Sequence, residues 1–191
     1  MQTSLPVREI TAVDFPVIER LFGPNGACAG CWCMFWRMRA SEWRLSGRNE
    51  DHRLGFKALL ESSKVYAAMA FKSNEPVGWV TYGPRESFPR VENSRVLKRA
   101  APLGTWSIVC FYIPRQWRGK GIANRLLDAA VGYCKAHGAT EIEAFPVELK
   151  DPSHQKPATD IYTGVATQFV RIGFVPVPRP KNMRPIYVKK Q

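Results

Sequence analysis

The feature that most constrains the fold is an apolar strand that leads, through a glycine-containing turn, into an amphipathic helix. Residues 106–113 form a near-continuous apolar run, which is typical of a strand at the centre of a sheet, and Pro114 ends it. Beyond the turn, apolar side chains recur at spacings of three and four from Ile122 to Cys134, the period of a helix with one buried face. The pattern predicts a layered α/β structure built around this strand and helix.

The turn between them, residues 116–123, has the composition of an anion-binding loop. The first turn of a helix leaves backbone N–H groups without intrahelical partners, and the aligned peptide dipoles place partial positive charge there. Gly119 and Gly121 let the backbone approach a phosphate closely, and Arg118 and Lys120 add full charges. The turn therefore predicts a pyrophosphate site, although it matches neither the Rossmann fingerprint nor the P-loop. A simple glycine-rich connection is the alternative.

Strand and helix patterns alternate along the rest of the chain. Strands are predicted at 5–10, 65–71, 77–82, 140–145, 174–177 and 185–188, and helices at 11–22, 50–62, 94–100 and 160–172. We expect one domain over residues 1–191, with a Cys- and aromatic-rich segment at about 26–38. Because no run approaches the roughly 18 apolar residues of a membrane span and the five cysteines are odd in number, we expect a cytoplasmic protein without a disulfide framework.

The turn also resembles a known family motif. Gln116, Gly119 and Gly121 occupy the defining positions of the acetyl-CoA-binding motif Gln/Arg-x-x-Gly-x-Gly/Ala of the GNAT (Gcn5-related N-acetyltransferase) superfamily. Residues 169–174 are similar to the closing helix-to-strand motif of that family, and residues 76–78 resemble its hairpin element. The Cys-rich segment lies outside the general pattern and looks like a bacterial subgroup of unknown substrate. The resemblance implies the GNAT fold, a mostly antiparallel twisted sheet of six to seven strands with a splayed central parallel pair and helices on both faces.

The resemblance further implies a function and its residues. It implies transfer of an acetyl group from acetyl-CoA to a primary amine, which we expect to belong to a small molecule, by direct attack in a ternary complex. Backbone amides of the motif would bind the pyrophosphate of the cofactor, and the strand before it would pair with the pantetheine arm. The residues that inherit cofactor binding are Val109, Phe111, Ile113, Gln116, Arg118, Gly119, Lys120, Gly121, Ile122 and Ala123.

Two departures from the family pattern concern proton transfer. Many members carry a tyrosine, the general acid, where this chain has Phe169, and many carry a glutamate base at the start of the central strand, which is absent here. We take Tyr162 and Glu148 as the candidate catalytic residues in their place. Glu143 is expected to point to solvent, because the alternation of its strand turns its neighbours inward. Cys110 is expected to act as a small apolar residue.

The segment at 26–38 leaves two interpretations open. Cys28, Cys31 and Cys33 form a C-x-x-C-x-C pattern, but a structural zinc needs four ligands and only His52 offers a fourth. We therefore favour no metal, and expect the segment to form a hydrophobic wall of the substrate pocket or part of the core instead. Trp32 and Trp36, together with Trp43, are the candidate acceptor-binding residues, through the faces of their rings.

There are two alternatives to an enzyme, and the net charge of +12 motivates the second of them. A CoA-binding sensor on the same scaffold, with little turnover, would account for the missing acid and base. A nucleic-acid-binding protein would account for the charge, but the basic residues are dispersed rather than gathered in a recognition element. We therefore expect acetyl-CoA and an amine as partners, no nucleic acid and no membrane, and leave a homodimer open.

Overall fold

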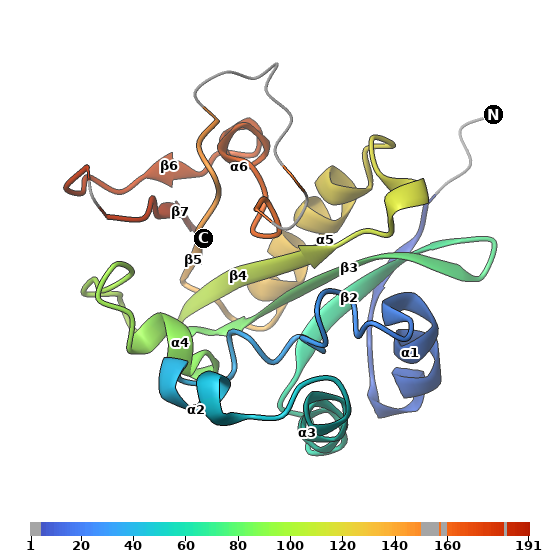
Figure 1. Ribbon diagram of the computed structural model, residues 1–191. Helices are drawn as coiled ribbons and strands as arrows, with labels where there is room; N and C mark the ends of the chain where they lie inside the picture. Colours follow the sequence, from blue (N-terminus) through green and yellow to red (C-terminus); the bar gives the residue numbers. More distant parts are fainter. Residues whose placement is uncertain (1–4, 150–156, 158–159, 182) are drawn as a thin grey trace.

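The computed structural model describes residues 5–149, 157, 160–181 and 183–191. Within these residues, seven strands form one sheet in the order β1-β2-β3-β4-β5-β7-β6, with every neighbouring pair antiparallel except β4 and β5 (Figure 1). The strands are β1 (Val7–Glu9), β2 (Tyr66–Lys72), β3 (Glu75–Pro84), β4 (Thr105–Tyr112), β5 (Glu141–Ala144), β6 (Val175–Pro176) and β7 (Tyr187–Lys190). The predicted mostly antiparallel sheet with a single parallel pair is confirmed.

Helices cover both faces of this sheet. The long helix α5 (Ile122–Ala136) packs on one face, while α1 (Phe15–Phe22) and α3 (Glu50–Glu61) pack on the other (Figure 1). Because side chains alternate across a strand, Ala68 and Ala70 of β2 face α5, whereas Ala67 and Met69 join the core beneath α1 and α3. The shorter helices are α2 (Ala40–Leu45), α4 (Pro89–Glu92) and α6 (Ala166–Arg171), with 3₁₀ helices at Ala12–Asp14, Arg85–Ser87 and Arg115–Trp117.

The parallel pair separates halfway along β4. Residues Thr105–Ile108 pair with β5, but β5 ends at Ala144 while β4 continues to Tyr112 beside β3. Past this point the segment before α6 approaches β4, and the Phe111 N–H donates a hydrogen bond to the Tyr162 carbonyl oxygen at 2.6 Å. The splayed edge of β4 therefore faces a loop rather than a strand, which leaves room for a cavity.

Two of the predicted helices differ from the structure, and one observed helix was not predicted. The helix expected at 94–100 is absent among the described residues, and a single helical turn at Pro89–Glu92 lies before it, with proline at its first position. The helix expected at 160–172 begins only at Ala166, because Gly164 has a φ of 81° and turns the chain just before it. Helix α2 was not predicted. It lies in a polar stretch, and none of its side chains is buried.

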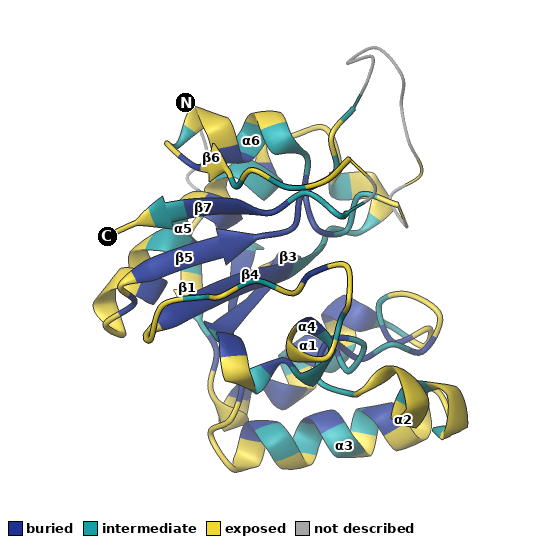
Figure 2. Ribbon diagram, turned by 90° about the vertical axis from the view of Figure 1, so that its left-hand side faces the viewer, coloured by how far each residue is buried: buried dark blue, intermediate teal, exposed yellow. Residues whose placement is uncertain are grey.

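The expectation that Glu143 points to solvent is wrong. Its side chain is fully buried, and β5 is buried along its length (Figure 2). The Arg85 and Arg99 guanidinium groups both donate to its carboxylate, with 2.7 Å between Arg99 Nε and Glu143 Oε2, and the Ser107 hydroxyl donates at 2.7 Å. The alternation of side chains along β5 places Glu143 on the face of the sheet opposite α5. That face is not exposed to solvent, because the connection that carries both arginines covers it.

Candidate functional site

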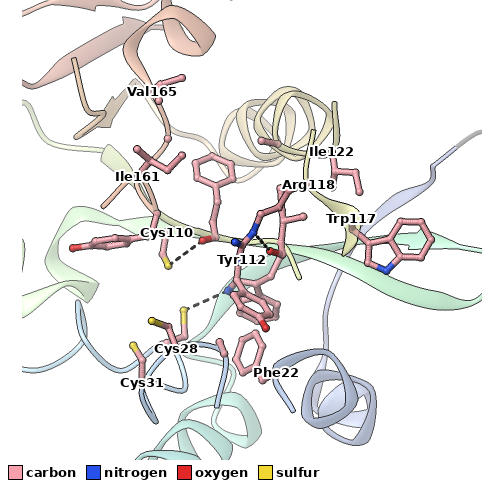
Figure 3. A pocket seen from close by; sticks show the side chains of 18 of the residues that line it. Phe22, Cys28, Cys31, Cys110, Tyr112, Trp117, Arg118, Ile122, Ile161 and Val165 are labelled. Atoms are coloured by element: carbon pink, nitrogen blue, oxygen red, sulfur yellow. Dashed lines mark hydrogen bonds between the residues drawn. The ribbon is translucent and has the colours of Figure 1, made fainter. Parts of the chain in front are cut away.

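A cavity of about 660 Å³ lies where β4 and β5 part (Figure 3). Its walls come from the end of β4, the start of α5, the Cys- and aromatic-rich segment, and the loop that precedes α6. This volume lies within the range of small-molecule sites, about 300–1,000 Å³. One end is built from glycines and an arginine, and the other from aromatic rings and sulfur atoms, so the two ends suit different chemical groups.

The glycine end is the start of α5. Gly119 and Gly121 have φ angles of 72° and 76°, left-handed conformations that glycine adopts readily, and a Cβ at either position would meet no other atom within 4 Å. Ile122 begins the helix, and its N-cap residue, Gly121, has no side chain with which to cap the first turn. Arg118 lies beside it, held by a hydrogen bond from its Nε to the Ile113 carbonyl oxygen at 2.9 Å. Uncapped N–H groups, open space and a guanidinium together suit an anion.

Most of the predicted cofactor-binding residues line this cavity, but three do not. The lining residues are Phe111, Ile113, Arg118, Gly119, Gly121, Ile122 and Ala123. Val109 is fully buried in the core, and Gln116 lines a separate cavity of about 310 Å³. Lys120 is not a lining residue. Its Nζ lies 4.6 Å from the centre of the ring of Trp117, which does line the cavity, and Lys72 Nζ lies 4.8 Å from the same ring.

The strand β4 offers fewer free backbone groups than predicted. The Phe111 N–H, expected to pair with the pantetheine arm, already donates to the Tyr162 carbonyl oxygen. A cofactor that lies along this edge must use other groups of β4 or displace that contact.

The other end of the cavity is aromatic, and part of the Cys- and aromatic-rich segment lines it. Trp36 lines it, is 3% exposed and stacks on Phe145 with 5.8 Å between ring centroids. The Trp36 indole N–H is buried and has no hydrogen-bond partner among the residues that the structure describes. Trp43, Phe35 and Trp79 also line this end.

Trp32, the other predicted acceptor-binding residue, does not line the cavity. Its ring packs in the core against Phe15 and Phe22, and its indole N–H donates to Asn49 Oδ1 at 2.9 Å. Trp32 and Cys33 both have positive φ angles, 45° and 60°, so the chain turns sharply between Cys31 and Met34. This turn sends Trp32 away from the cavity, which a sequence pattern does not reveal.

The two predicted catalytic residues lie in different places. Tyr162 lines the cavity, and burial raises the pKa of its hydroxyl, an effect that the charge and hydrogen bond of Arg184 oppose. Glu148 is exposed and is not a lining residue, and its carboxylate accepts a hydrogen bond from the Tyr187 hydroxyl at 2.9 Å. Phe169, in the position of the family's tyrosine, is fully buried against Phe174, so the site has no hydroxyl there.

Cysteines gather at the aromatic end of the cavity, and the sequence analysis did not predict that they meet. Cys28, Cys31 and Cys33 line the cavity together with Cys110 of β4. A hydrogen bond with Cys110, and then the charge of Arg37, lower the pKa of the Cys33 thiol to about 7, although burial acts in the opposite direction. Burial raises the pKa of Cys31 to about 11. Near neutral pH a large share of Cys33 is therefore a thiolate, whereas Cys31 stays protonated.

No metal site is formed by the described side chains. Among residues 5–149, 157, 160–181 and 183–191, no group of three or more His, Cys, Asp or Glu is arranged to hold a metal ion. His52, considered as a fourth zinc ligand, is buried, with its ring nitrogens 2.7 Å from the Gly30 carbonyl oxygen and 2.9 Å from the Ser46 hydroxyl. In the same part of the chain, no helix is long and apolar enough to cross a bilayer.

The motif, the splayed parallel pair and the cavity beside them agree with one family of proteins. The profile of the acetyltransferase (GNAT) family matches residues 32–156. The chain belongs to this family. It is accordingly an N-acetyltransferase that uses acetyl-CoA, as the glycine end of the cavity predicts. No curated protein sequence matches the chain.

Solved structures show the same fold in other GNAT proteins. A ribosomal-protein-alanine N-acetyltransferase from Brucella melitensis aligns with a TM-score of 0.56 at 14% identity, over 98% of this chain and 100% of that chain. A GCN5-related N-acetyltransferase from Kribbella flavida aligns with 0.55 at 15%, over 98% of each chain. The PaiA N-acetyltransferase from Thermoplasma acidophilum, solved with coenzyme A, aligns with 0.51 at 16%, over 98% of this chain and 99% of that chain. At these identities the likeness concerns the fold alone.

Proposed function

We propose that this GNAT enzyme transfers the acetyl group of acetyl-CoA to a small, uncharged aromatic amine. The observation that carries the proposal is the composition of the cavity wall. Among the described lining residues, Arg118 carries the one permanent charge and none is a carboxylate, while the end opposite the glycines consists of aromatic rings and thiols. A cavity of this kind accepts flat apolar groups and provides no counter-ion for an ammonium group.

Cations already occupy the ring faces that an ammonium group would need. The Arg90 guanidinium lies 4.0 Å from the centre of the Phe35 ring and 5.9 Å from that of Trp43. The Arg184 guanidinium lies 5.8 Å from the centre of the Trp36 ring. These charges repel a second cation, so the cavity disfavours a cationic acceptor on these rings.

An aromatic amine also fits the missing base. Its nitrogen lone pair is delocalised into the ring, so it is uncharged at neutral pH and ready to attack without losing a proton first. An alkylamine is an ammonium ion at that pH, and needs a base such as the family's glutamate before it becomes a nucleophile. The absence of a carboxylate among the described lining residues therefore agrees with the proposed acceptor.

The two ends of the cavity orient the reactants in this proposal. The pyrophosphate of acetyl-CoA binds at Gly119, Gly121 and Arg118, and the pantetheine arm follows β4 past Phe111 toward the thiols. The acetyl group then lies near Trp36 and Tyr162, with the acceptor beyond it. Tyr162 replaces the family's tyrosine as the proton donor to the CoA thiolate, because it lines the cavity and belongs to the segment just before α6, the helix that carries Phe169.

Release of the CoA thiol tests the proposal with a matched pair of acceptors. Aniline and benzylamine have nearly the same size, but at neutral pH the first is neutral and the second is an ammonium ion. We expect faster acetyl transfer to aniline, and a gain for benzylamine in the Arg90→Gln variant, which removes one cation from the rings. Faster transfer to benzylamine by the wild-type protein would contradict the acceptor class. Tight acetyl-CoA binding without turnover of either amine would favour the CoA-binding sensor.

A further inference from the structure

Tyr162, the proton donor of the proposed function, is fixed beside the splayed edge of β4. Its carbonyl oxygen accepts a hydrogen bond from the Phe111 N–H at 2.6 Å. Its ring packs against those of Trp36 and Phe35, with 6.3 Å and 6.1 Å between the ring centroids. A tyrosine that gives up its proton becomes a phenolate, and a phenolate among apolar groups is unfavourable unless a positive charge lies beside it.

Arg184 brings such a charge from a distant part of the chain. It lies just before β7, and its Nη2 donates to the Thr163 hydroxyl at 3.0 Å and to the Phe145 carbonyl oxygen at 3.2 Å. Thr163 is fully buried and directly follows Tyr162, so these bonds fix the guanidinium next to the proton donor. The same guanidinium lies 5.8 Å from the centre of the Trp36 ring, against which Tyr162 packs.

The groups that act on the Tyr162 hydroxyl come from several elements. Burial raises the pKa of this hydroxyl, and the thiols of Cys110 and Cys31 raise it further, whereas the charge of Arg184 and a hydrogen bond from it lower it. Arg90 also interacts with Tyr162 through its charge, but its Nε donates to a backbone carbonyl oxygen, at 2.6 Å. Among these described groups, Arg184 combines a positive charge with a hydrogen bond to the hydroxyl.

We propose that Arg184 is a positioning residue for acetyl transfer, which orients the Tyr162 hydroxyl and stabilises the phenolate that forms when this hydroxyl protonates CoA. The inference rests on the proposed function, because it assigns a partner to the proton donor of that function. It also explains why a cation lies beside a cavity whose acceptor is uncharged, since the guanidinium acts on the proton donor and not on the substrate.

The proton transfers balance over one turnover. The amine nitrogen attacks the thioester carbonyl carbon, the bond from that carbon to the CoA sulfur breaks, and the sulfur takes the proton of Tyr162. The phenolate then takes the proton that the amine nitrogen loses, directly or through water. The products are the acetylated amine and CoA, and Tyr162 is protonated again. Arg184 stays charged throughout and exchanges no proton, and its attraction for the phenolate is strong because little water separates the two groups.

Acetyl transfer to aniline by variants of Arg184 tests this role. Arg184→Gln removes the charge, and we expect kcat to fall about 10-fold while KM for aniline and the affinity for acetyl-CoA are kept, because the phenolate exists only during the reaction. Arg184→Lys keeps a charge but not the planar guanidinium, and should lower kcat about threefold. The control Arg171→Gln removes an equal charge from an exposed ion pair with Asp128, and should leave kcat unchanged.

A double variant distinguishes this role from a structural one. Without the Tyr162 hydroxyl there is no phenolate to stabilise, so Arg184→Gln should lower kcat no further when it is added to Tyr162→Phe. An equal loss of kcat in both backgrounds would mean that Arg184 supports only the fold, and would overturn the inference while the acceptor class stands. A higher KM for aniline with an unchanged kcat would also overturn it, since Arg184 would then bind the acceptor.

Calorimetric titration with acetyl-CoA shows whether each variant is folded. If Arg184→Gln does not bind acetyl-CoA, Arg184→Lys takes its place in the same comparison. Its loss of kcat should then disappear in the Tyr162→Phe background, and a loss that persists there contradicts the inference. A wild-type protein that acetylates neither aniline nor benzylamine overturns the proposed function itself, and the role of Arg184 with it.

Discussion

Substitution of Gly121 by alanine separates the two reasons for a glycine at the start of α5. Gly121 has a φ of 76°, and an alanine there costs about 1–2 kcal/mol of folding free energy, since non-glycine residues resist the left-handed conformation. A Cβ would meet no other atom within 4 Å, so no clash adds to that cost. The same Cβ would occupy the open space at the uncapped N–H groups, where we place the pyrophosphate. The variant should therefore fold with a modest loss of stability and bind acetyl-CoA poorly.

Gly138 provides a matched control at the other end of the same helix. Its φ is 85°, and a Cβ there also meets no other atom within 4 Å. The helix has 15 residues and is about 22 Å long, so Gly138 lies far from the cavity. Gly138→Ala should lower the melting temperature as much as Gly121→Ala does, by about 2–8 °C, because the conformational cost is the same.

Affinity for acetyl-CoA distinguishes the two variants. Loss of a charge-assisted hydrogen bond between phosphate and backbone costs about 1.5–3 kcal/mol, which corresponds to roughly 10–100-fold weaker binding. We expect that loss in calorimetric titration of Gly121→Ala and unchanged affinity in Gly138→Ala. If both variants bind acetyl-CoA as tightly as the wild-type protein, the start of α5 is only a turn and the pyrophosphate lies elsewhere.

Three further perturbations test other parts of the structure. Glu143→Gln removes the buried carboxylate between two arginines, and should lower the free energy of unfolding in urea by about 3 kcal/mol. The control Glu61→Gln, in an exposed ion pair, should change that free energy by less than about 1 kcal/mol. Equal effects of the two substitutions would refute the buried network. Tyr162→Phe should reduce kcat with aniline by about 100-fold while acetyl-CoA affinity is kept, and an unchanged kcat would remove the hydroxyl from the reaction. The rate at which iodoacetamide alkylates Cys33, followed at the peptide level, should rise as the pH increases through about 7, since the pKa of Cys33 is lowered and only the thiolate reacts. A midpoint near the ordinary value of about 8.5 would contradict that lowered pKa.

Local patterns in the sequence were sufficient for the centre of the fold. The apolar run of β4, the glycines at 119 and 121 and the helical period of α5 depend on residues close in the chain, so their structure follows from strand, turn and helix preferences. The same holds for the hairpin of β2 and β3. The helices expected at 94–100 and 160–172 failed because a proline and a glycine shifted or shortened them, which is a local effect that the periodicity alone did not weigh.

The environment of the site was decided by tertiary structure. Alternation correctly placed Glu143 on the face of the sheet opposite α5, but only the path of the connection with Arg85 and Arg99 shows that this face is buried. Trp32 and Trp36 are close in sequence, yet one packs in the core and the other lines the cavity, because the backbone turns sharply between them.

The sequence by itself determined the family, the donor and the end of the cavity that we assign to the phosphates, since these depend on a short motif whose backbone conformation is local. The thiol chemistry depended on the tertiary structure. Cys33 and Cys110 are far apart in the chain, and no sequence pattern shows that they meet. Their pKa shifts arise only when folding places one beside the other, with Trp79 and Arg37 around them, in a space from which water is largely excluded. Hydrogen bonds and charges act through space, so the reactive thiol is a property of the folded cavity.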